Sequence, residues 1–179
     1  MRRRRQAQAL SAAVDLLRIP SQARMMRSAP LPSGILLLLR LAAEDGEALL
    51  DAENITKRAR ESHRDAAIFF IEQILLASNS DAYRMLGLDK TATAVEMRRH
   101  MAYLLKWLHP DRNTDPHKGR LARRVLLAWN ELSAARRAKE DKLAAGQSKP
   151  ESRAGSPARR RPMYSQEKTT ARAPRTAKQ

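Results

Sequence analysis

The sequence predicts an all-α protein. Three observations support this fold class: apolar residues recur at helical spacing in the middle of the chain, capping signals precede these runs, and proline or glycine follows them. The length of 179 residues suits one ordinary domain with extensions, or two small ones. The absence of cysteine excludes disulfides and thiolate zinc sites. The six glycines form neither a GxxxxGK(S/T) nor a GxGxxG pattern, so the common phosphate-binding loops are excluded too.

The net charge of +16 is concentrated at the two ends of the chain. Residues 1–30 carry +6 and 142–179 carry +8, whereas 31–80 carry −3 and 81–141 carry +5. Both ends are rich in Arg, Ala, Ser and Pro and poor in large apolar residues, so they bury too little surface to offset the entropy lost on ordering. We therefore predict disordered basic ends, with a flexible arm over 1–30 and a tail over 142–179.

The N-terminal stretch raises the question of targeting. Its arginines and scarcity of acids are typical of a mitochondrial transit peptide, but Asp15 interrupts the apolar part and no secretory apolar region follows. The most hydrophobic run, GILLLLRLAA, has about ten residues, far short of the roughly 20 that span a bilayer. We expect a protein that is not transmembrane and is cytoplasmic, with the mitochondrial matrix as the alternative.

Residues 31–79 are predicted to form a small helical segment of unknown role. Within residues 33–50 the pattern predicts a buried helix with Ser33 as N-cap, and the turn signal at Asp45-Gly46 ends this helix. The following helix has an apolar stripe ending in Phe70 and Ile74, and His63 is expected on its solvated side. These helices could dock on the C-terminal half of the chain, dimerise or bind a client protein.

Capping signals are sharper from Ser80 onward. Asp81 is an N-cap candidate for a short helix that Gly87 ends. Thr93 and Glu96 fit a capping box at the start of a second helix. The apolar stripe of this helix contains Met97, Met101, Leu104 and Leu108, and its basic residues point elsewhere.

The second helix must end near Leu108, because Pro110 disfavours helical geometry at His109. A third helix begins at Asp115-Pro116, a favoured pairing of N-cap and first helical residue. Its apolar stripe consists of Leu121, Val125, Ala128 and Leu132. The two helices therefore form an antiparallel hairpin with the sequence HPDRNT at its tip.

These residues resemble the J-domain of DnaJ-type proteins. Residues 81–113, DAYRMLGLDKTATAVEMRRHMAYLLKWLHPDRN, are similar to the first two helices and signature loop of that domain without a gap. The opening D-x-Y-x-x-L-G and the closing H-P-D-(K/R)-N both occur at the expected spacing. The next helix is similar to the third helix as far as Leu132. The resemblance implies a J-domain over 80–141.

The resemblance also implies a function and a site. J-domains bind a DnaK-type chaperone, of the heat shock protein 70 class, and stimulate its ATP hydrolysis. Carried over residue by residue, the chaperone-binding residues would be His109, Pro110, Asp111, Arg112, Asn113, Arg98, Arg99 and Lys106. A basic helix face speeds encounter with an acidic partner, and a proline-fixed loop presents Asp111 with little loss of entropy on binding.

Two features depart from the family pattern. Ala102, Tyr103 and Trp107 stand where basic or small residues are often found, which would weaken the coupling to the chaperone or make it selective. The Asp-Pro-x-x-(K/R) stretch after the third helix is replaced by residues 133–137, so a fourth helix is expected to merge with the third. We expect neither the zinc repeats nor the substrate-binding domain of full-length DnaJ in these residues.

The sequence predicts neither catalysis nor a cofactor. His109 has Asp111 nearby but no further nucleophile or acid, and His100, His109 and His117 match no metal-binding spacing such as HExxH. Trp107 and Trp129 are interpreted as packing residues between helices.

Two alternatives to a chaperone adaptor remain. The basic ends could bind nucleic acid without sequence preference, or an acidic surface, on a J-like scaffold that no longer couples to a chaperone. The chain could also occupy a chaperone partner without activating it, although the intact HPD triplet argues against this.

Overall fold

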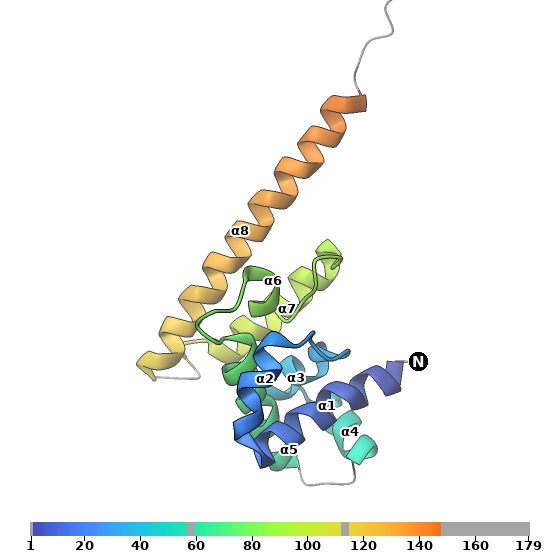
Figure 1. Ribbon diagram of the computed structural model, residues 1–179, viewed down its shortest axis with the longest axis vertical. Coiled ribbons are helices and arrows are strands. Elements are labelled where there is room, and N and C mark those ends of the chain that lie inside the picture. Colours follow the sequence, from blue (N-terminus) through green and yellow to red (C-terminus); the bar gives the residue numbers. More distant parts are fainter. Residues whose placement is uncertain (1, 57–59, 112–114, 148–179) are drawn as a thin grey trace, which may run out of the picture.

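The computed structural model describes residues 2–56, 60–111 and 115–147. In this part of the chain every regular element is helical, which confirms the predicted all-α class (Figure 1). The elements are α1 (Arg2–Arg18), η1 (Pro20–Gln22), α2 (Ala23–Ser28), α3 (Ile35–Ala42), α4 (Gly46–Thr56), α5 (Arg60–Phe70), η2 (Ile71–Leu75), α6 (Ala82–Met85), α7 (Ala94–Leu108) and α8 (Pro116–Gln147). None of the described helices is long and apolar enough to cross a membrane.

The N-terminal residues form a packed helix. Leu10 and Leu16 of α1 are fully buried, and the helix packs against α3, α4 and α5. The prediction of a flexible arm over 1–30 is therefore wrong for its described residues. The arginine-rich composition concealed a buried apolar face, which consists of Ala9, Leu10, Ala13, Val14 and Leu16.

The buried helix predicted from residue 33 is α3, and it ends before the predicted turn at Asp45-Gly46, where α4 begins. Gly34 (φ 96°) precedes α3, and a Cβ there would lie 2.3 Å from the carbonyl oxygen of Arg5, so only glycine fits. Ser33 is not the N-cap. Glu44 (φ 56°) turns the chain after α3, and the Asp45 carboxylate then accepts the Ala48 N–H at 3.1 Å in the first turn of α4.

α5 continues into a single π-helical turn, η2, which carries the buried Ile74 and Leu75. The predicted apolar stripe around Phe70 is buried as expected. His63, predicted to be solvated, is instead fully buried and hydrogen-bonds through Nε2 to the Thr56 hydroxyl of α4. The pairing of α4 with α5 decides this placement, which helical spacing within α5 alone could not show.

The predicted hairpin is present with its caps. Asp81 accepts the Arg84 N–H at 2.9 Å at the start of α6, and Gly87 (φ 69°) ends this helix. Thr93 and Glu96 form the predicted capping box of α7. The two predicted stripes are buried along the α7–α8 contact, and they consist of Met97, Met101, Leu104, Leu108, Leu121, Val125, Ala128 and Leu132.

α8 runs without interruption to Gln147, so the fourth helix merges with the third as predicted. Its second half projects from the rest of the molecule (Figure 1). Helix therefore extends six residues past the predicted boundary at 141, and residues 142–147 are not disordered. The remainder of the predicted tail, 148–179, lies outside the described residues.

Arginine side chains join the hairpin to the N-terminal helices by donating to backbone carbonyls. Arg84 donates to the carbonyls of Met26 and Ala29 at 2.7 and 3.0 Å, beside the end of α2. Arg124 of α8 donates to the carbonyls of Leu76 and Ala77 at 2.8 Å each, just after η2. Helix ends leave such carbonyls without intrahelical partners, so these contacts satisfy them. The buried apolar residues of both regions form one continuous core.

The packing of α1 makes a prediction about stability. Replacing Leu10 by alanine should lower the free energy of unfolding by about 2–5 kcal/mol, because it leaves a cavity in the core. Leu17 of the same helix is 36% exposed, so Leu17→Ala should cost about 1 kcal/mol or less. Urea unfolding of the two variants checks this, and equal small losses would show that α1 is not part of the core.

Candidate functional site

The exposed face of α7 is basic and leads directly to the hairpin tip. Arg98, Arg99 and Lys106 are all exposed, and with Val95 and Ala102 they share the side of the helix that faces away from the core. His109 continues this face at the end of α7. The structure therefore brings the predicted basic residues and the start of the HPD triplet onto one surface.

The HPD triplet forms a turn that is held by its own histidine. His109 has φ −59° and ψ 133°, the extended geometry that a following proline favours. The Asp111 backbone N–H donates to His109 Nδ1 at 3.2 Å, which leaves the proton of the neutral ring on Nε2. The side chain of His109 is 52% exposed and that of Asp111 is 86% exposed. Both side chains are therefore accessible to a binding partner.

The Asp111 carboxylate lies 3.5 Å from His109 Nδ1. Arg112 and Asn113, the other predicted loop contacts, lie outside the described residues. α8 resumes at the predicted cap, where Asp115 accepts the His117 N–H at 2.8 Å. The HPD turn therefore begins at the C-cap of α7, and α8 begins at the Asp115 cap.

The two aromatic residues that depart from the family pattern do not cover the basic face. Trp107 is buried between α7 and α8, with Lys118 Nζ 5.4 Å from its ring centroid, a cation–π distance. Tyr103 is half-buried and donates from its hydroxyl to Asp45 Oδ2 at 3.1 Å. Ala102 alone among the three departures lies on the exposed face, where it separates Arg98 and Arg99 from Lys106.

Tyr103 belongs to a polar network that joins α7 to the N-terminal helices. Arg40 of α3 is buried and donates to Asp45 at 2.8 Å and to Glu47 at 3.0 Å. The hydrogen bond from Arg40 holds the pKa of Asp45 down to about 2, and the Tyr103 hydroxyl contributes in the same direction. The ionised Asp45 therefore pairs with the buried Arg40 and also accepts the hydroxyl of Tyr103 on α7.

His100 has a structural role. Its Nδ1–H donates to the Leu86 carbonyl at 2.8 Å, which ties α7 to the end of α6. Burial lowers its pKa, so the ring is neutral near pH 7. Gly87 lies against this contact, and a Cβ there would be 2.5 Å from Ile35 Cγ2 of α3. The motif glycine thus marks the point where the hairpin meets the N-terminal helices.

The exposed groups of α7 and the HPD turn are suited to binding a partner. Along α7 and the turn it presents guanidinium and ammonium groups, an imidazole N–H and an exposed carboxylate, all toward solvent. Within the described residues, no three His, Asp or Glu side chains gather as a metal site would require. Among the same residues, His109 contacts Asp111 but no hydroxyl that it could activate.

Comparison with known proteins supports a DnaJ-like relationship for part of the chain. Over 79 residues the chain is 33% identical to the DnaJ protein P58IPK homolog A of Oryza sativa subsp. japonica, a match that covers 42% of this chain and 17% of that relative. The chain therefore spans less than a fifth of the length of that relative. No family model and no solved structure matches the chain.

The network around Asp45 predicts a particular pH dependence. The pKa of Asp45 in the folded state, about 2, lies below its ordinary value of 3.8. Its contribution to stability is therefore complete above about pH 4 and is lost as the pH falls toward 2, an expected loss of about 1–2 kcal/mol. Urea unfolding across pH 2–6 checks this. The free energy of unfolding of Asp45→Asn should be well below that of the wild type at pH 6 and close to it at pH 2.

Glu47→Gln is the matched control, because Glu47 contacts the same arginine but its side chain is 88% exposed. It should change stability by less than about 1 kcal/mol at every pH. A constant difference between Asp45→Asn and the wild type over the whole pH range would contradict the role assigned to the Asp45 carboxylate.

Proposed function

We propose that the protein is a J-domain co-chaperone that recruits a DnaK-type chaperone and stimulates its ATP hydrolysis through His109, Pro110 and Asp111. The observation that carries this proposal is the exposed HPD turn at the end of a basic helix face. The DnaJ-like match over part of the chain supports the same class of protein.

The geometry of the HPD turn suits a preformed binding site for a partner protein. The turn is fixed before binding by the ring of Pro110 and by the hydrogen bond that the Asp111 backbone N–H donates to His109. Little conformational entropy is therefore lost on complex formation. Arg98, Arg99 and Lys106 place positive charge beside it and would accelerate encounter with an acidic surface. The protein would act by binding, and the chaperone would perform the chemistry.

His109→Gln tests this function. In single-turnover ATPase measurements with a DnaK-type chaperone, wild-type protein should accelerate hydrolysis and His109→Gln should abolish the acceleration. Glutamine carries an acceptor and a donor only at the end of a flexible side chain and has no acceptor at the position of Nδ1, so the hydrogen bond that holds the turn is lost. The folded state should persist, because His109 is exposed.

His117→Gln is the control for that experiment. His117 is an exposed histidine in the first turn of α8, and its hydrogen bond to Asp115 uses the backbone N–H. This variant should stimulate hydrolysis as the wild type does. The proposed function is wrong if the wild-type protein does not accelerate ATP hydrolysis by any DnaK-type chaperone. It is also wrong if His109→Gln and His117→Gln give the same acceleration.

Nucleic-acid binding on a J-like scaffold is the competing function, and it rests on the basic sequence of 142–179. Gel shifts across salt concentrations distinguish it: deletion of 142–179 should abolish binding, whereas His109→Gln should leave it unchanged. Retention of binding after this deletion would contradict the competing function.

A further inference from the structure

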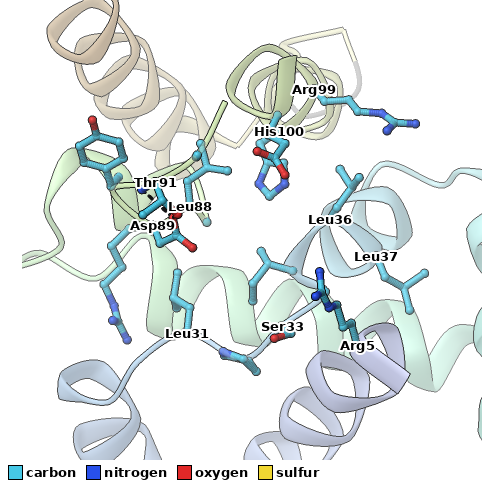
Figure 2. Close-up of a pocket in the computed structure, with 18 of the residues that line it drawn as sticks. Arg5, Leu31, Ser33, Leu36, Leu37, Leu88, Asp89, Thr91, Arg99 and His100 are labelled. Carbon is cyan, nitrogen blue, oxygen red and sulfur yellow. Dashed lines mark hydrogen bonds between the residues drawn. The ribbon is translucent and has the colours of Figure 1, made fainter. Parts of the chain in front are cut away.

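A cleft separates the first turns of α1 and the start of α3 from the α6–α7 segment. It encloses about 960 Å³. Figure 2 shows Arg5 and Arg99 on one side of the cleft with Leu36 between them, whereas Asp89 and Thr91 lie on the opposite side. An arginine of the N-terminal helices and an arginine of the basic face of α7 therefore line the same cleft.

The carboxylates of the cleft are already engaged in local structure. Asp81 caps α6, and Asp89 accepts from both the backbone N–H and the hydroxyl of Thr91. Glu96 accepts from the backbone N–H of Thr93 at 2.8 Å in the capping box. These hydrogen bonds hold the pKa values of Asp89 and Glu96 below their ordinary values, so both stay ionised. None of them reaches across the cleft to the arginines.

The cations of the cleft divide into two groups. Arg84 donates to backbone carbonyls and Arg40 is paired with carboxylates. Arg5, Lys90 and Arg99 are exposed, and their side chains form no hydrogen bond or ion pair with any residue that the structure describes. On the Arg5–Arg99 side, positive charge is therefore left available for a partner.

We propose that Arg5 of α1 and Arg98 and Arg99 of α7, with the exposed Val95, form a composite basic surface that binds an acidic protein surface. This inference rests on the proposed function, and the partner is the DnaK-type chaperone itself. The N-terminal helices then contribute directly to chaperone recognition, beyond their support of the hairpin. Arg5 adds a positive charge to those of α7, whose row is interrupted at Ala102.

A protein partner fits this surface better than a nucleic acid does. Val95 is 62% exposed beside the arginines of α7 and offers an apolar contact, and arginine with apolar neighbours is typical of protein interfaces. The ionised Asp89 and Glu96 line the same cleft and would repel a uniformly charged phosphate backbone. A protein surface of mixed charge can place cations opposite them.

Charge reversal at Arg5 tests the composite surface in the full-length chain. Arg5→Glu should raise the concentration that gives half-maximal stimulation of chaperone ATPase by about three- to tenfold, with the maximal rate unchanged. The increase should shrink in high salt, where exposed charges are screened. The fold should be retained, because an acid in the first turns of α1 interacts favourably with the helix dipole.

Arg3→Glu is the matched control. It makes the same change of charge in the same helix, but two helical residues point about 200° apart, so Arg3 faces away from the cleft. It should change the half-maximal concentration less than about twofold, whereas Arg99→Glu should weaken stimulation at least as much as Arg5→Glu. Thermal unfolding of each variant confirms that the fold is intact.

The outcomes separate this inference from the proposed function. If the wild type stimulates hydrolysis, His109→Gln does not, and Arg5→Glu equals Arg3→Glu, the composite surface is wrong and the proposed function stands. If Arg5→Glu weakens binding to a DNA duplex but leaves the ATPase response unchanged, the surface serves nucleic acid and the inference is overturned. If the wild type stimulates no DnaK-type chaperone, both fall.

Discussion

A buried charge in the most apolar helix links the two parts of this protein. α3 is almost entirely leucine, isoleucine and alanine, yet Arg40 is buried within it and needs a partner there. Asp45 supplies that partner, starts α4 and accepts the Tyr103 hydroxyl of α7. The N-terminal helices and the hairpin therefore share an ionic network as well as a core, and α7 is held along one side.

This attachment leaves the opposite side of α7 open. Tyr103 faces the N-terminal helices and Trp107 faces α8, whereas Arg98, Arg99 and Lys106 face solvent. The same constraint brings α1 close enough for Arg5 to line a cleft with Arg99. A partner that docks on the basic face of α7 would thus lie close to the N-terminal helices, for which the sequence left docking, dimerisation and client binding open.

Local chemistry determined what could be predicted from the sequence. The caps at Asp81 and Thr93, the helix end before Pro110 and the paired stripes of the hairpin depend on neighbours within a few residues, and all are present. The errors concern contacts between distant residues. His63 is buried because α4 packs on α5, and α1 is ordered because its alanine-rich face fits against α3 and α5. No local signal in the sequence placed Tyr103 near Asp45, or Arg5 in the same cleft as Arg99.

Amide chemical-shift mapping tests the central claim most directly. Isotopically labelled full-length protein titrated with a DnaK-type chaperone should show perturbations along the exposed face of α7, at His109 and Asp111, and in the first turns of α1. The buried contact between α7 and α8 should be little affected. The absence of perturbation at α7 and His109, or perturbation confined to the outer face of α8, would contradict the account.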